Sequence, residues 1–161
     1  MTGFDTTLTR GRPRARANRE ENLLEVDNLS VTFARKGSRP VRAVDGVSFE
    51  VRPGQIVGIV GESGSGKSVT SLAVMGLLPP RGVQTDGQIR YRGQQLLGAS
   101  TAELNRLRGR EIAMVFQDPL GSLDPSFAVG DQLVEAILAH ERIPLARARG
   151  RALEMLDAVR I

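Results

Sequence analysis

The sequence predicts an α/β fold in which a small antiparallel β sheet precedes a strand, a glycine-rich loop and a helix. Residues 23–33 and 41–51 alternate apolar and polar side chains, as half-buried strands do. Residues 55–60 are a short, apolar, β-branched run of the kind that forms a buried parallel strand. Residues 69–78 are apolar on most sides and stop before a Pro-Pro pair, which predicts a helix.

The loop between the parallel strand and the helix reads G-E-S-G-S-G-K-S, that is, Gly61, Glu62, Ser63, Gly64, Ser65, Gly66, Lys67 and Ser68. Backbone N–H groups converge on an anion only where the chain curls tightly, so we expect Gly61, Gly64 and Gly66 at positive φ. Lys67 supplies a mobile charge for β and γ phosphates, and Ser68 a hydroxyl for a bridging Mg²⁺. A merely structural turn would need neither side chain, so the loop predicts binding of a nucleoside triphosphate at the positive end of the helix.

Length and composition limit the other possibilities. The 161 residues, 40% of them hydrophobic, suffice for one compact domain with a core. The chain has no cysteine, which excludes a disulfide framework and a thiolate metal site, and its single histidine, His140, excludes a histidine cluster. We expect His140 to be a surface helix residue. No apolar run approaches the ~18 residues of a membrane span, and no signal peptide is recognisable, so we expect the chain not to enter the membrane.

The net charge of +4 comes partly from one end of the chain. Residues 10–19 contain five arginines, no acidic residue and no apolar periodicity. We therefore expect residues 1–22 to form a disordered, solvated arm, and residues 23–161 to form the domain. Contact of this arm with anionic lipid or nucleic acid stays open, but aromatic residues make up only 4% and do not interleave with the arginines. The prediction is a protein without a nucleic-acid partner.

The remaining elements can be placed from local signals. A helix at 101–108 should be capped by Ser100 or Thr101, with Glu103 in its first turn. The others are expected as a polar turn at 34–40, a bulge at Gly46, a tight turn at 52–54, a strand and turn at 87–96, and amphipathic helices at 129–140 and 145–161.

A second informative stretch is E-I-A-M-V-F-Q-D-P at 111–119. Residues 112–116 are uniformly apolar and predict a buried strand that ends at Gln117. Polar residues at the carboxyl ends of such strands lie where α/β folds bind ligands. The amide of Gln117 can ligate a cation or orient a water molecule, although a glutamine here can also be an ordinary loop residue.

Together these residues resemble a known family. The segment A-V-D-G-V-S-F-E-V-R-P-G-Q-I-V-G-I-V before the loop, and L-R-G-R-E-I-A-M-V-F-Q-D-P-L-G-S-L-D-P after it, resemble the nucleotide-binding subunit of an ABC transporter. The block F-Q-D-P-x-x-S-L-D-P is typical of the oligopeptide, dipeptide and nickel importers. The resemblance runs from about Leu24 to the last residue and implies a P-loop NTPase of ABC type, with an N-terminal antiparallel β subdomain and the start of a helical subdomain.

The resemblance also implies roles for single residues. Phe33 matches the aromatic residue on which the family stacks adenine, although a strand aromatic packed on the sheet is an equally good interpretation. Gln117 matches the glutamine that ligates Mg²⁺ beside the γ-phosphate, with Ser68 as the other ligand. The segment from Asp118 to about Gly130 matches the start of the subdomain that contacts the membrane-spanning partner.

At the level of the whole protein, the resemblance implies ATP and Mg²⁺ as cofactors and ATP hydrolysis that powers import of a solute, expected to be a peptide. The implied partners are membrane-spanning permease subunits, a second ATP-binding subunit and, indirectly, an extracytoplasmic solute-binding protein. The expected location is the cytoplasmic face of the cell membrane.

The sequence lacks three motifs of the family. The family's Leu-Ser-Gly-Gly-Gln signature, its second acidic strand and its switch histidine are all missing from the 161 residues. We therefore expect the N-terminal portion of an ABC ATP-binding domain, with an incomplete core sheet, that binds ATP but does not hydrolyse it alone. Two alternatives are a non-enzymatic nucleotide-binding half-domain with a regulatory role, and a P-loop kinase or GTPase, against which the F-Q-D-P-x-x-S-L-D-P block argues.

Overall fold

A computed structural model describes residues 22–161, apart from 35–36 and 118–119. The expected arm at 1–22 therefore lies outside the described residues, except for Asn22, which is buried and donates from Nδ2 to Glu25 Oε1 at 3.3 Å. The chain divides into two compact units, one ending at Ala99 and one spanning Ser100–Ile161. Each unit is described by itself.

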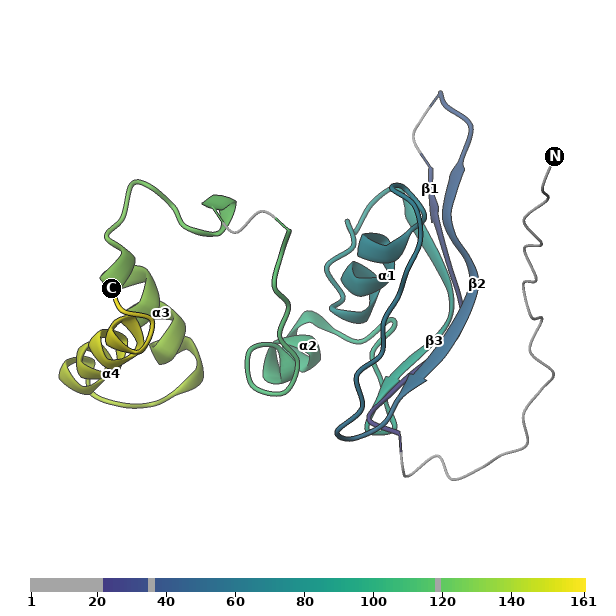
Figure 1. Cartoon of the computed structure of the whole chain (residues 1–161). Helices are drawn as coiled ribbons and strands as arrows, with labels where there is room; N and C mark the ends of the chain where they lie inside the picture. The colour runs from purple at the N-terminus through teal and green to yellow at the C-terminus, as the bar shows by residue number, and fades with distance from the viewer. Residues whose placement is uncertain (1–21, 35–36, 118–119) are drawn as a thin grey trace, which may run out of the picture. The chain divides into compact units, whose positions relative to one another are not determined.

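The first unit is built on a four-stranded antiparallel sheet with the order β2-β1-β3-β4. The strands are β1 (Leu24–Phe33), β2 (Val41–Val51), β3 (Val83–Tyr91) and β4 (Gln94–Gln95). Figure 1 shows β1 between β2 and β3, with the following helix on one face. The two predicted N-terminal strands are confirmed to within one residue, and β3 begins four residues before the strand expected at 87.

A bulge at Asn28 sets which side chains of β1 reach the core. Val26 and Leu29 are both buried although they lie three positions apart, because the pairing register shifts between them. Asn28 has a φ of 50°, and glycines on the two neighbouring strands, Gly46 and Gly87, have φ of 62° and 99°. A Cβ on Gly87 would lie 2.5 Å from the Asn28 carbonyl oxygen. The predicted irregularity at Gly46 is thus part of a bulge that runs across three strands.

The helix after the glycine-rich loop, α1 (Lys67–Val74), is shorter than the predicted helix at 69–78. It ends at Val74, two residues before Gly76, rather than at the prolines, and the prediction was wrong on this point. Gly76 has a φ of 62°, its N–H donates to Ala73 O, and the N–H of Leu77 donates to Leu72 O. These two bonds satisfy carbonyls at the end of the helix, as in the Schellman motif.

The two predicted buried strands at 55–60 and 112–116 are not formed, which corrects the sequence analysis. In the first segment Ile56 and Val60 are 97% and 94% exposed, and in the second Val115 is 93% exposed. Neither segment forms a strand ladder with any described residue. A strand requires hydrogen-bonded neighbours, so an apolar run without them stays extended and solvated. The described sheet is therefore incomplete, as expected.

The second unit contains α2 (Thr101–Leu107), a 3-10 turn η1 (Leu120–Ser122), α3 (Val129–His140) and α4 (Leu145–Ala158). The predicted helix at 129–140 has its expected bounds, and the one at 145–161 ends three residues early. α3 and α4 pack through a small core of Val134, Ile137, Ala148 and Ala152, flanked by Leu133 and Ile143. No helix in the described part of the chain has the length and apolar character needed to cross a membrane.

The start of α2 is a reciprocal cap, as its sequence suggested. Ser100 Oγ accepts from the Glu103 N–H, and Glu103 Oε2 accepts from the Ser100 N–H at 2.8 Å. The hydrogen bond from the Ser100 hydroxyl, followed by that from its backbone N–H, lowers the pKa of Glu103. Both bonds favour the charged carboxylate.

This cap predicts a pH-dependent helix start. Because the pKa of Glu103 is lowered in the folded state, its contribution is present above the unfolded pKa and is lost as pH falls through the folded value. We expect hydrogen exchange of the Ser100 amide, corrected for intrinsic rates, to quicken as the solution is acidified. In Glu103→Gln this pH dependence should vanish, and an unchanged profile in that variant would contradict the assignment.

Candidate functional site

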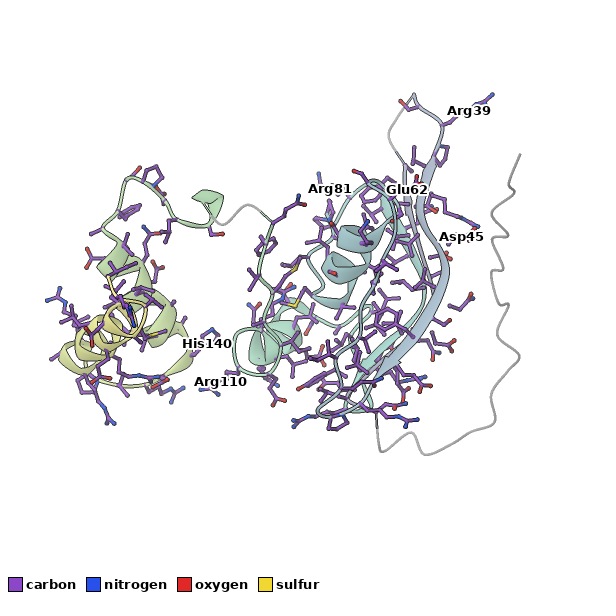
Figure 2. All side chains as sticks on the ribbon, viewed as in Figure 1. Arg39, Asp45, Glu62, Arg81, Arg110 and His140 are labelled. Atoms are coloured by element: carbon purple, nitrogen blue, oxygen red, sulfur yellow. The ribbon has the colours of Figure 1, made fainter. Side chains whose placement is uncertain are left out.

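The glycine-rich loop is closed around the ammonium group of Lys67. Nζ of Lys67 donates to the carbonyl oxygens of Gly61 and Glu62, both at 2.7 Å, and to Ser65 Oγ at 3.2 Å. These three partners match the three donors of an ammonium group. The ammonium group of Lys67, which the sequence predicts to bind phosphate, therefore also holds the loop in its curled form. Figure 2 shows the labelled Glu62 in this loop, before α1.

Glycine is required in the loop for two different reasons. Gly64 and Gly66 have φ of 80° and 89°, which confirms the positive φ expected for them. Gly61 does not have a positive φ, so the expectation was wrong for this residue. Position 61 needs a glycine because there is no room for a side chain: a Cβ there would lie 2.6 Å from Ser65 Oγ.

Gly66 also anchors the loop to the sheet. A Cβ on Gly66 would lie 2.3 Å from the carbonyl oxygen of Ala43 and 3.2 Å from Val44 Cγ2, both on β2. Gly66 is buried and is the residue before the first turn of α1. The buried Thr70 secures this end of the helix, since its Oγ1 donates to Gly66 O at 3.0 Å. The register of the loop on β2 is therefore fixed by a close backbone contact.

The N-terminus of α1 has the electrostatic character of an anion site. In this helix, which lies wholly within the described residues, no side chain caps the N-terminus and the first turn holds no acidic residue. The first N–H groups of a helix lack intrahelical partners and carry partial positive charge. Ser68 is exposed in this turn, beside the half-buried Lys67. The loop and helix together can bind a phosphate group through backbone N–H groups and one ammonium group.

Phe33 and Gln117 lie away from the loop in sequence. Phe33 is half-buried at the last position of β1, where it pairs with Val41 and Val83. Gln117 belongs to the second unit and lines an open depression together with Phe116, Gly121 and Ser122. Phe33 thus shares a unit with the loop. The expected start of the helical subdomain at Asp118 lies outside the described residues, whereas its continuation from 120 onward is described.

Two features of the second unit were not anticipated. Gln132 makes three hydrogen bonds to the turn at 124–127, which sequence reasoning did not single out. His140 is half-buried rather than a plain surface residue: a Cβ on Gly109 would lie 2.3 Å from its Nε2, and Arg110 donates to its carbonyl oxygen. Figure 2 shows Arg110 beside His140.

Comparison with known proteins agrees with the motifs. The ABC transporter family model matches residues 44–161. The chain is 50% identical over 140 residues to the oligopeptide transport ATP-binding protein OppD of Mycobacterium bovis, covering 86% of this chain and 22% of that protein. It is 48% identical over 139 residues to the dipeptide transport ATP-binding protein DppD of Escherichia coli, covering 86% and 42%. The chain therefore spans less than half the length of these relatives.

A solved structure supports the fold. The structure of cbiO1 from Clostridium perfringens, described as part of the ABC transporter complex cbiONQ, matches with a TM-score of 0.58 and 24% identity. The match covers 86% of this chain and 50% of the other. At this identity the likeness concerns the fold alone. With the family model matching most of its length, the chain belongs to the ABC transporter family.

Proposed function

We propose that this chain is the nucleotide-binding portion of an ATP-binding subunit, and that ATP binds with its phosphates in the loop at 61–68. The observation that carries the proposal is the closed loop: Lys67 sits among Gly61, Glu62 and Ser65, next to the uncapped start of α1. An incoming β or γ phosphate competes for the ammonium group and accepts from the loop N–H groups. Membership of the ABC transporter family favours ATP as the nucleotide.

The residues present fit a Mg²⁺ ion that arrives with the nucleotide. Hard cations take oxygen ligands, and Mg²⁺ is usually held by one or two protein groups plus phosphate oxygens and water. Within the described residues no cluster of three His, Cys, Asp or Glu side chains could hold a metal by itself. The exposed Ser68 hydroxyl and the Gln117 amide oxygen are the proposed protein ligands, and the ion would neutralise phosphate charge.

The proposed adenine contact is Phe33, which is half-buried at the end of β1. Aromatic rings stack on bases with little regard to base identity. Phe33 ends β1 and shares the first unit with the loop, so both contacts belong to one structural unit. This contact would add affinity and would discriminate only weakly between ATP and GTP.

In the intact protein, the proposed activity is ATP hydrolysis coupled to import of a peptide. The names of the oligopeptide and dipeptide transport relatives support this substrate class. The proposed partners are membrane-spanning permease subunits and a second ATP-binding subunit, with an extracytoplasmic solute-binding protein acting through the permease. The proposed location is the cytoplasmic face of the membrane, and no nucleic-acid partner is proposed.

For the 161-residue chain alone we propose binding without turnover. Hydrolysis needs a positioned base for water as well as a phosphate clamp. The only acidic residue of the loop, Glu62, is exposed, and its carbonyl oxygen accepts from Lys67. The exposed run at 55–60 and the exposed Val115 and Phe116 of the second run support an incomplete catalytic core.

A fluorescence titration tests the nucleotide proposal. We expect a ribose-labelled ATP analogue with Mg²⁺ to bind the chain, and unlabelled ATP and GTP to displace it about equally well. Lys67→Ala should weaken binding by about tenfold or more, because a charge-assisted hydrogen bond of roughly 1.5–3 kcal/mol is lost. Arg92→Ala, a change on the hairpin turn between β3 and β4, serves as the control and should leave affinity unchanged. Equal affinity of the wild type and Lys67→Ala would contradict the proposed site.

A further inference from the structure

Residues 56–60, directly before the glycine-rich loop, have open backbone groups and an open apolar face. Their sequence is I-V-G-I-V. None of their backbone N–H and C=O groups is hydrogen-bonded to a described residue. Ile56 and Val60 are almost fully exposed, whereas Val57 and Ile59 are 36% and 45% exposed. This alternation is that of an extended chain, and it places Ile56 and Val60 on the more open face.

The run is complementary to a second copy of itself. About a two-fold axis through Gly58, antiparallel pairing places Ile56 opposite Val60 of the other copy. Val57 then lies opposite Ile59 of the other copy. Each pair joins two β-branched side chains, which pack well across neighbouring strands. No described atom lies within 4 Å of the position that a Cβ on Gly58 would take, so the space beside the axis is open.

The charges at the two ends of the run favour the antiparallel arrangement. Residues 55–60 carry no charge, and they are preceded by the exposed Arg52 and followed by the exposed Glu62. Antiparallel pairing brings the Arg52 end of each copy towards the Glu62 end of the other, whereas parallel pairing brings like charges together. The ammonium group of Lys67, which follows Glu62, is held inside its own loop.

We propose that residues 55–60 are a self-association surface, through which two copies of the 161-residue chain pair as antiparallel strands about Gly58. Pairing satisfies backbone groups that the chain itself leaves to water, and it gathers Ile56 and Val60 of both copies on one face. An open, uncharged and β-branched edge is a template for such pairing. The association needs no nucleotide and is independent of the proposed function.

Single cysteines test the register, because the chain has no cysteine of its own. Opposite residues on antiparallel strands have Cα atoms about 4.5–5.5 Å apart, within the span of a disulfide. Gly58→Cys, at a position without positive φ, should therefore form a covalent dimer on mild oxidation with copper phenanthroline. Val60→Cys is the matched control and should not, because its two copies would lie about 13–14 Å apart. A mixture of Val60→Cys and Ile56→Cys should form the covalent dimer.

Sedimentation velocity over a range of concentrations measures the association itself. We expect the wild type to dimerise reversibly, and Ile56→Lys to raise the dissociation constant by about tenfold or more, because the ammonium group would face apolar side chains of the other copy. Ile56 is 97% exposed in the single chain, so circular dichroism of this variant should be unchanged. Leu153→Lys replaces another exposed leucine, on α4, and should leave the dissociation constant unchanged.

The contrary outcomes are distinct. A wild type that stays monomeric up to millimolar concentration, or an association that Ile56→Lys leaves unchanged, would overturn the proposed surface. Oxidation that joins two Val60→Cys chains as readily as two Gly58→Cys chains would overturn the two-fold antiparallel pairing about Gly58.

Discussion

Gly66→Ala is expected to abolish nucleotide binding and to destabilise the first unit by about 3 kcal/mol. The added Cβ causes both a steric clash with β2 and backbone strain. The new Cβ would lie 2.3 Å from the Ala43 carbonyl oxygen, a backbone atom of β2 that cannot rotate away. The residue would also have to keep a φ of 89°, which side chains disfavour. Either the loop leaves β2 or the strand shifts, and both displace Lys67. Chemical denaturation and ATP titration of the variant measure the two effects.

Gly64→Ala is the matched control, in the same loop. Gly64 has a similar φ of 80°, but no atom lies within 4 Å of the position that a Cβ would take there. Only the conformational cost of about 1 kcal/mol should remain. Equal destabilisation by the two substitutions would show that the contact with Ala43 does not anchor the loop.

Leu29→Ala should destabilise the first unit by about 3 kcal/mol, the usual cost of the cavity that such a change leaves in a core. Leu29 is fully buried on β1, which pairs with β2 on one side and β3 on the other. The bulge at Asn28 turns Leu29 toward the same core as Val26, so its side chain is fully buried and the substitution carries the whole cost of the cavity. Amide exchange in β1, β2 and β3 should accelerate by about 100-fold, the equivalent of that free energy.

The amides of α3 and α4 should keep their protection in Leu29→Ala, since those helices have a core of their own. Leu153→Ala provides the control for side-chain size, because Leu153 is 68% exposed. It should change the free energy of unfolding by no more than about 0.5 kcal/mol. Simultaneous loss of protection in both units on Leu29→Ala would contradict the division into two compact units.

Features that depend on local sequence were predictable. α3 has its expected bounds, and Ser100 caps α2 with Glu103 as the sequence suggested. The tight turn expected at 52–54 also formed, with the Gln55 N–H donating to Arg52 O. In each case the deciding interaction lies within a few residues, so periodicity and capping chemistry contain the information.

Features that depend on distant neighbours were not predictable. The run at 55–60 has the composition of a buried strand, but strand formation needs a hydrogen-bonded neighbour, and no described residue provides one. The role of Gly66 depends on the approach of Ala43, more than twenty residues earlier. The three hydrogen bonds of Gln132 depend on the turn at 124–127 lying against α3, which no local pattern encodes.

Nucleotide binding in the loop at 61–68 is tested by equilibrium dialysis of the 161-residue chain against Mg²⁺ and ATP labelled on both the α and the γ phosphorus. We expect the wild type to retain both labels in equal proportion, Lys67→Ala to retain far less of either, and no free phosphate to accumulate. Failure of the wild type to retain label at millimolar ATP, or retention that Lys67→Ala leaves unchanged, would contradict nucleotide binding in the loop at 61–68. Accumulation of phosphate that depends on Lys67 would contradict binding without turnover.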